Sequence, residues 1–183
     1  MAGGWVTDEK GRLKRETIHH MGRRLPDFDY SSRRIYEITV VLEERKAVLG
    51  RLVKIGHGPD GEGGEVDQGW VVEPSEWGEV VLGCWREIEA RWPQVSLIEA
   101  QLMPDHFHGV LFVKEALPKG KSLGSIIGGF KAGCTKGWRE IAAALSGAGP
   151  DGLARSPTGG RVPHWAEGYV DTILFGRGQL EKM

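Results

Sequence analysis

The strongest constraint on the fold of this chain is a pair of strand-like segments joined by a short Pro-Asp connection. Residues 95–103 and 106–113 both have the apolar, β-branched and aromatic content that is typical of strands. Because Pro104 and Asp105 alone separate them, we expect the two segments to pair as an antiparallel hairpin. The fold should therefore contain an antiparallel sheet built around this hairpin.

Further elements surround the hairpin in the order strand, helix, hairpin, helix. A first strand is predicted over residues 35–42, where β-branched and aromatic residues dominate. A helix is predicted from Ser75, a suitable N-cap, to Pro93. A second helix is predicted from Ser122, because a single apolar stripe follows at helical spacing. Its members are Leu123, Ile126, Ile127, Phe130, Cys134, Trp138, Ile141 and Leu145.

The length of the chain predicts a single domain. It has 183 residues, of which 40% are hydrophobic, enough for one compact core and short for two. Residues 1–27 are polar and basic without a clear helical or strand period, so we expect a partly ordered arm there. The domain is expected over residues 28–183.

The remaining segments are predicted to be connections or short packed pieces. The glycine-rich residues 56–69 predict a flexible loop before a short strand at 70–72. Residues 146–163 contain many glycines and prolines and predict a mobile linker. Ordered structure is expected again over 165–174, and residues 179–183 resemble the first turn of a helix.

His106 and His108 alternate along the second strand of the predicted hairpin. Side chains on a strand point alternately to its two faces, so both imidazoles face one side and Phe107 faces the other. Two neutral imidazoles placed in this way can hold a divalent cation, with a third ligand from elsewhere in the fold. Taken alone, the pattern favours a pair of surface histidines on an exposed sheet.

The rest of that strand favours a metal site instead. Apolar residues continue on both of its faces as far as Val113, so we expect the strand to be covered on both sides. Partly buried imidazoles need polar partners, and a bound metal would satisfy both rings at once.

Several separated motifs agree with one known family. Residues 103–110, MPDHFHGV, are similar to a signature M-P-N/D-H-hydrophobic-H-G-hydrophobic. Residues 124–131 are similar to a helix that ends in Phe-Lys, and residues 165–174 resemble a W-x-x-G-Y-x-D-x-I-L segment. On these motifs the chain resembles the HUH single-tyrosine transposases, in the IS200-like branch called REP-associated tyrosine transposases. Shorter matches are Tyr30-Ser31 and Ser75-Glu76-Trp77-Gly78.

The resemblance covers about residues 28–183 in the family's order and leaves the arm and the glycine-rich loops unmatched. It implies an α+β fold of the ferredoxin-like or RRM-like kind, in which two helices pack on one face of an antiparallel sheet. The order of the predicted elements is compatible with that fold.

The resemblance also implies an activity. In the family the histidine pair, here His106 and His108, holds Mg²⁺ or Mn²⁺ against the scissile phosphate of single-stranded or hairpin DNA, with a polar side chain from a later helix. A tyrosine hydroxyl attacks the phosphorus, which leaves a 5′-phosphotyrosine link and a free 3′-hydroxyl. The implied function is a metal-dependent endonuclease and strand transferase used in transposition, with His106 and His108 as its catalytic metal ligands.

The nucleophilic tyrosine has no counterpart in the sequence. In the family it lies on a C-terminal helix shortly after the segment that residues 165–174 match, and this chain ends at Met183 before that position. Tyr169 matches an aromatic position of the family that is not the nucleophile, and we expect it to pack in the fold. We therefore expect the tyrosine helix to be truncated and these residues alone to be defective in cleavage.

Two other functions stay open at this point. The missing tyrosine motivates a catalytically inactive module that binds hairpin or single-stranded DNA. An unrelated metallohydrolase that uses the His-x-His pair is less favoured, because the chain shows too few strands and helices for the barrel folds that usually carry such a pair.

Charged residues are segregated along the chain, although the formal net charge is −1. Basic residues outnumber acidic ones over residues 114–136, and acidic residues dominate 54–103. Basic stretches beside the histidine strand would suit a groove that follows DNA phosphates, and ordinary solvated surface is the alternative. The predicted DNA-binding residues are Lys131 first, and then Arg33 and Arg34.

Cysteine content and hydropathy predict a cytoplasmic protein. Cys84 and Cys134 lie far apart in the sequence and suggest no disulfide framework. No apolar run approaches the roughly eighteen residues of a membrane span, and the N-terminus lacks the apolar core of a signal peptide. A monomer and a homodimer are both compatible with the sequence.

Overall fold

The structure is a computed structural model, which describes residues 5–7, 13–15, 28–54, 69–147 and 162–174. Most of the predicted arm, loop and linker, and the predicted helical turn at 179–183, lie outside the described residues. Inside the arm, β1 (Trp5–Thr7) and β2 (Leu13–Arg15) pair as a short antiparallel ribbon.

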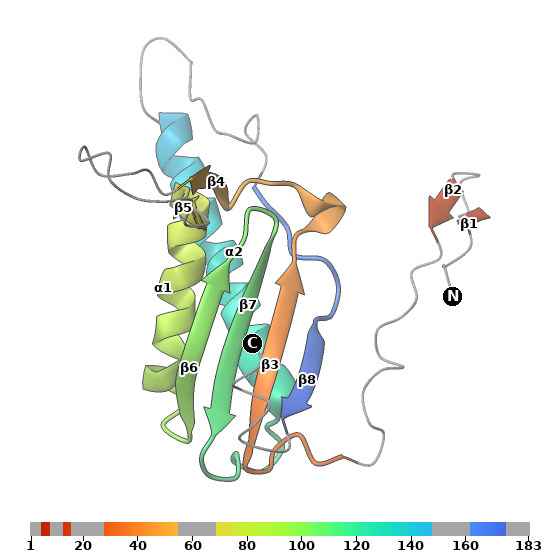
Figure 1. Cartoon of the computed structure of the whole chain (residues 1–183), viewed down its shortest axis with the longest axis vertical. Coiled ribbons are helices and arrows are strands. Elements are labelled where there is room, and N and C mark those ends of the chain that lie inside the picture. Colours follow the sequence, from red (N-terminus) through yellow and green to blue (C-terminus); the bar gives the residue numbers. More distant parts are fainter. Residues whose placement is uncertain (1–4, 8–12, 16–27, 55–68, 148–161, 175–183) are drawn as a thin grey trace, which may run out of the picture.

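A four-stranded antiparallel sheet in the order β6-β7-β3-β8 carries the fold (Figure 1). The predicted hairpin is confirmed, since β6 pairs with β7 from Leu102 opposite Phe107 to Val95 opposite Val113. The first predicted strand pairs with both β7 and β8, so it lies inside the sheet. The four strands are β3 (Arg34–Val41), β6 (Val95–Leu102), β7 (His106–Val113) and β8 (Val170–Leu174).

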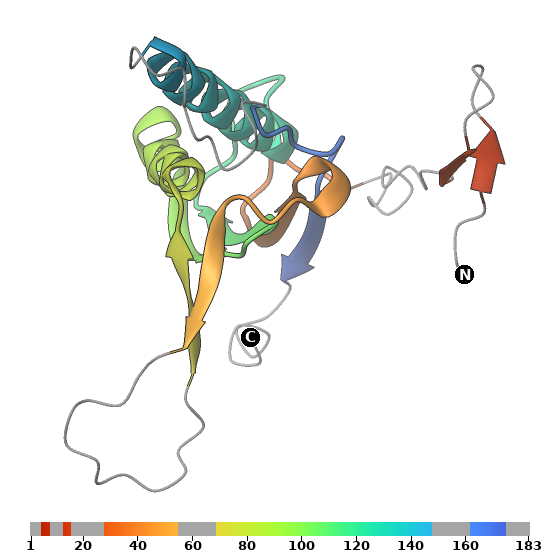
Figure 2. The same ribbon diagram turned by 90° about the horizontal axis from the view of Figure 1, so that it is seen from above.

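Two helices, α1 (Glu76–Arg91) and α2 (Leu123–Gly147), pack on the same face of this sheet (Figure 2). The α1 N-cap is Ser75, as predicted, and its hydroxyl accepts a hydrogen bond from the Gly78 N–H at 3.2 Å. The strand order and the one-sided helices confirm the predicted α+β, ferredoxin-like arrangement. None of the helices in the described part of the chain is long and apolar enough to cross a membrane.

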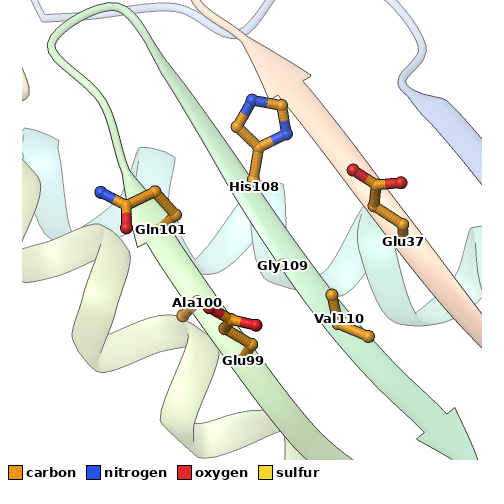
Figure 3. Close-up of a pocket in the computed structure, with 7 residues that line it drawn as sticks. All are labelled: Glu37, Glu99, Ala100, Gln101, His108, Gly109 and Val110. Carbon is orange, nitrogen blue, oxygen red and sulfur yellow. The ribbon is translucent and has the colours of Figure 1, made fainter. Parts of the chain in front are cut away.

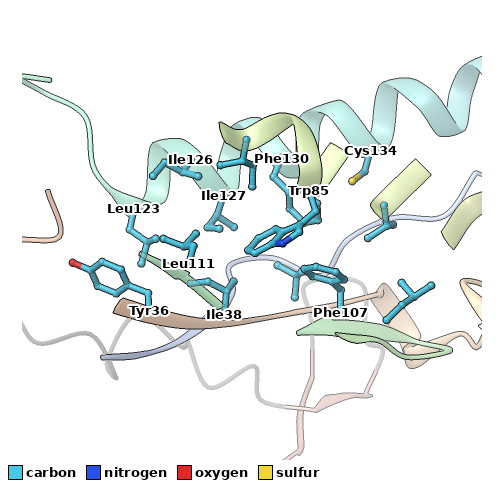
Figure 4. Close-up of a cluster of buried hydrophobic side chains, with 14 of the residues drawn as sticks. Tyr36, Ile38, Trp85, Phe107, Leu111, Leu123, Ile126, Ile127, Phe130 and Cys134 are labelled. Atoms are coloured by element: carbon cyan, nitrogen blue, oxygen red, sulfur yellow. The ribbon is translucent and has the colours of Figure 1, made fainter. Parts of the chain in front are cut away.

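The hydrophobic core lies between the helices and the sheet (Figure 4). Alternate residues of the central strands face it, so Ile38 of β3 and Phe107 of β7 are fully buried. The apolar stripe of α2 covers them, with Ile127 and Phe130 buried as the helical spacing predicted. Because this face of the sheet is filled with apolar side chains, polar chemistry can take place on the opposite face.

That opposite, open face differs from the prediction of a strand covered on both sides. No described helix packs over it, and His106, His108 and Phe112 of β7 keep part of their surface exposed. Val110, between them, is buried by its neighbours in the sheet. The histidines therefore lie on a surface that a ligand can reach.

A second hairpin was not predicted from the sequence. The short strand expected at 70–72 is present as β5 (Trp70–Pro74), and it pairs with β4 (Gly50–Lys54). The ribbon projects away from the sheet (Figure 2), and Trp70 at its outer end is 63% exposed. Because the ribbon buries little apolar surface, its first strand lacks the clear alternation that would have identified it.

Candidate functional site

His106 and His108 lie together on the open face, at the start of β7. Their ring centroids are 4.8 Å apart with the ring planes at 81°. The neighbouring strand β3 places Val41 opposite His106 and Thr39 opposite His108. The alternation of the strand thus brings the two imidazoles side by side, as the sequence predicted.

Each imidazole is held through its Nδ1 atom by a side chain of the fold. His106 Nδ1 lies 2.5 Å from Asp105 Oδ1, and His108 Nδ1 lies 2.9 Å from Thr39 Oγ1. In the tautomer with hydrogen on Nδ1, each ring donates that bond and keeps a lone pair on Nε2. Metal-binding histidines are commonly oriented in this way, by a carboxylate or another oxygen on the second ring nitrogen. The pair therefore suits a cation bound at the two Nε2 atoms.

Arg45 extends this chain of contacts beyond Asp105. Its Nε atom lies 2.9 Å from Asp105 Oδ2, so the carboxylate bridges the guanidinium and His106. Arg45 and the preceding Glu44 both have left-handed backbone angles, with φ of 53° and 59°. Such angles cost about 1–3 kcal/mol each for residues other than glycine, so the surrounding structure must hold them in place. Neither Arg45 nor Thr39 could be predicted as part of the site from the sequence, because neither lies in a motif with the histidines.

The electrostatic surroundings favour a neutral His108. Burial lowers its pKa below the ordinary value of 6.5, nearby His106 and Arg45 lower it further, and Glu37 acts in the opposite direction. A neutral imidazole is the form that binds a metal, so this shift reduces competition from protons.

The lowered pKa of His108 predicts a pH dependence of stability. Below its ordinary value of 6.5, the unfolded chain takes up a proton at this position that the folded protein resists. The unfolded state then binds more protons, so the free energy of unfolding should fall as the pH drops below about 6.5. Urea unfolding of the wild type and of His108→Gln at pH 7.5 and 5.5 measures this, and the variant should lose less stability. His164→Gln, at an exposed position, is the control, and an equal pH dependence in all three proteins would contradict the prediction.

A hollow of about 350 Å³ lies on the open face beside His108 (Figure 3). Val110 and Gly109 lie along its middle strand, and Glu37 and Glu99 come from the strands on either side. Gln101 lies opposite His108 on β6. The hollow provides room for a ligand next to the imidazole pair.

The described residues do not complete a metal site. Within them no group of three or more histidine, cysteine, aspartate and glutamate side chains is placed to hold a metal ion. The described residues therefore do not provide the third ligand that was predicted from the sequence.

Lys131, the first predicted DNA contact, is engaged within the fold. From α2, its ammonium donates hydrogen bonds to the carbonyl oxygens of Ala166 and Gly168, each at 2.7 Å. Burial lowers its pKa, and Glu167 opposes that shift. These contacts fasten the connection before β8 to α2, which gives Lys131 a structural role. A contact with DNA stays an untested prediction for this residue.

Removing the Lys131 ammonium should therefore reduce stability. Lys131→Met leaves two carbonyl groups without their donor, and we expect a loss of about 1–2 kcal/mol in the free energy of unfolding. Lys136→Met, an exposed position on the same helix, should change it by less than about 0.5 kcal/mol. Urea unfolding distinguishes the two. Equal stabilities, combined with weaker DNA binding for Lys131→Met, would favour the DNA contact instead.

Arg33 and Arg34 lie at the far end of the sheet from the histidines. Arg34 is opposite Val113, at the other end of β7. The Arg33 guanidinium carbon lies 5.0 Å from the ring centre of Phe112, which faces the open side four residues along β7 from His108. Four residues of a strand span roughly 13 Å. The structure therefore does not bring these arginines to the histidine pair, although Arg33 lies beside the same open face.

The three tyrosines all contribute to or pack against the hydrophobic core. Tyr36 is fully buried, and burial raises its pKa to about 12. Tyr30 stacks on it with ring centroids 6.1 Å apart, and Tyr169 packs against the same core. The core lies on the helix side of the sheet and the histidines on the other. None of these hydroxyls is placed as a nucleophile for the histidine site, which agrees with the expectation for Tyr169.

Comparisons with known proteins give distant similarities. No protein-family model matches the chain. A protein of Haemophilus influenzae (strain Rd), described as uncharacterized, is 27% identical over 143 residues, which cover 67% of this chain and 71% of that protein. Among solved structures, a REP-associated tyrosine transposase bound to a REP hairpin has a TM-score of 0.48 and 12% identity, over 87% of this chain and 67% of the other. A Deinococcus radiodurans protein provisionally described as a transposase has a TM-score of 0.45 and 14% identity, over 87% and 92% of the two chains.

Proposed function

We propose that this chain is the metal- and DNA-binding part of a transposase-type endonuclease and strand transferase that acts on single-stranded or hairpin DNA. One observation carries the proposal: two imidazoles meet on the open face of the sheet, each oriented through Nδ1. Neither Nε2 atom has a hydrogen-bond partner within the described residues. The class of substrate comes from the resemblance of the segment that contains these histidines to the HUH transposases.

The residues present fit part of a Mg²⁺ or Mn²⁺ site. His106 and His108 would hold the ion, and because the pKa of His108 is lowered from its ordinary value, protons compete less for that ring. When bound, the ion would polarise a phosphoryl oxygen and stabilise the charge that develops during phosphoryl transfer. Imidazole is a softer ligand than Mg²⁺ prefers, so of these two ions we expect Mn²⁺ to bind more tightly.

The remaining residues of the open face would position the DNA strand. The hollow beside His108 has room for a base, whereas Glu37 and Glu99 in its lining would repel a phosphate there. The face continues along β7 to Phe112, where Arg33 contributes a positive charge. A single strand can follow such a track with its phosphates near the basic side chains. The helix side of the sheet offers no such path, because the core fills it.

The nucleophile is proposed to come from sequence that follows Met183 or from a second chain. Tyr30, Tyr36 and Tyr169 are all engaged in the core, so another tyrosine is required for cleavage. The same observation favours a second function for these 183 residues by themselves, a module that binds hairpin DNA and does not cut it.

A covalent-adduct experiment tests both functions. The 183-residue chain, and a protein extended by the residues that follow it in its gene, are incubated with a hairpin-bearing single-stranded oligonucleotide and Mn²⁺. A denaturing gel then shows whether a protein–DNA adduct forms. An adduct with the extended protein alone supports the transposase function. If both proteins bind the hairpin and neither forms an adduct, the binding module is favoured, and failure of both to bind DNA excludes both functions.

A further inference from the structure

We propose that Arg45 binds a DNA phosphate beside the histidine pair while it holds Asp105 in position. This inference rests on the proposed function, because it names a substrate contact of the same site. It assigns to Arg45 a phosphodiester ligand that neither the motifs nor the charge pattern of the sequence had indicated.

The contacts of Arg45 leave most of its guanidinium available. Its Nε atom pairs with Asp105 Oδ2 at 2.9 Å, and the described residues provide no further ion pair to its Nη atoms. The Arg45 side chain is 61% exposed, whereas that of Asp105 is 20% exposed. A guanidinium has five N–H donors in a planar fork, so one edge can bind a carboxylate while the two Nη atoms bind a phosphate.

Arg45 is connected to the histidine pair through Asp105. Through Asp105 it is one carboxylate away from His106. The ring of His106 in turn lies beside that of His108, with the ring centroids 4.8 Å apart. A phosphate bound near the Nε2 atoms of the pair would therefore come within the field of the guanidinium.

The backbone conformation at Arg45 indicates that the fold holds this side chain in a fixed position. Glu44 and Arg45 are consecutive non-glycine residues with positive φ, a combination that persists where the surroundings impose it. The turn is held by hydrogen bonds from Arg45 N to Leu42 O at 3.1 Å and from Glu43 N to His164 O at 2.8 Å. An ion pair whose guanidinium is 61% exposed contributes little to stability, so the pair with Asp105 does not by itself account for two strained residues.

The salt dependence of DNA binding tests the proposal. The 183-residue chain is titrated onto a fluorescein-labelled single-stranded oligonucleotide in EDTA, so that no metal contributes, over a series of NaCl concentrations. Arg45→Gly removes the guanidinium and suits the left-handed backbone, so the variant should fold. We expect weaker binding and a shallower salt dependence. The slope of log K against log[salt] is negative, and its magnitude should fall by about 0.7, the value for one phosphate contact with a single strand.

Glu44→Gly is the matched control, since it places a glycine at the neighbouring left-handed position and keeps Arg45. The magnitude of its slope of log K against log[salt] should be at least that of the wild type. A wild-type slope in Arg45→Gly overturns the proposal, and so does an equal decrease in both variants, which would assign the effect to the turn. If the wild type does not bind the oligonucleotide, the proposed function fails with it; if it binds and the slopes agree, this inference alone fails.

Discussion

Exchanging His108 for alanine is expected to reduce Mn²⁺-dependent DNA cleavage by the extended protein by about 100-fold or more. The exchange removes one of the two imidazoles that lie side by side on the open face. Loss of an outer partner of a metal ligand alone typically costs 10–100-fold. His106→Ala should have an effect of the same size. The measurement is the rate of adduct formation at saturating DNA, together with the affinity of the 183-residue chain for Mn²⁺ by calorimetry.

The control for both variants is His164→Ala, which makes the same exchange at an exposed histidine near the end of β3. It should retain the Mn²⁺ affinity and the cleavage rate of the wild type. Unchanged Mn²⁺ affinity in both His106→Ala and His108→Ala would show that the metal is bound elsewhere. If Mn²⁺ binding is lost and DNA binding in EDTA is kept, the histidines act through the metal and not as direct DNA contacts.

Replacing Gly109 with alanine is expected to destabilise the fold by about 1–3 kcal/mol, the usual cost of overpacking a core. A Cβ atom at this position would lie 2.4 Å from Cζ2 and 2.5 Å from Cη2 of Trp85. The indole has little freedom to move away, because Phe107 and Phe130 pack against it with ring centroids at 4.9 and 5.6 Å. Since Gly109 follows His108 directly, the shift of the strand should also weaken Mn²⁺ binding.

Gly129→Ala is the matched control for this substitution. A Cβ atom there meets no atom within 4 Å, and the residue lies inside α2. Alanine should stabilise the helix by about 0.5–1 kcal/mol relative to glycine. Urea unfolding of both variants should therefore give changes of opposite sign. Equal stability of Gly109→Ala and the wild type would show that Trp85 does not press on β7.

Most of the fold could be predicted because its elements depend on interactions between residues close in the sequence. The apolar stripe that begins at Leu123 and the N-cap at Ser75 are local signals, and both helices begin where these signals occur. The hairpin of β6 and β7 is also local, because residues 103–105 alone connect its two strands. The β4–β5 ribbon was missed because it buries little surface and its strands are separated by a long stretch of chain.

In the candidate site, the placement of the two histidines could be predicted from local geometry in the same way. The period of a strand determined that His106 and His108 share a face, and the core prediction determined that Phe107 points away from them. The sequence by itself thus determined which two imidazoles meet. It could not determine how they are held or what charge lies beside them.

The tertiary structure decided those points, because the contacts join residues far apart in the chain. Thr39 reaches His108 across the pairing of β3 with β7, and the strained turn at Glu44 brings Arg45 to Asp105. The charge of Lys131 led to the prediction of a DNA contact. In the fold its ammonium donates hydrogen bonds to carbonyl groups 35 and 37 residues away. Spacing along a strand or helix is set by local backbone geometry, whereas the partner of a polar side chain is set by which distant segments the core brings together.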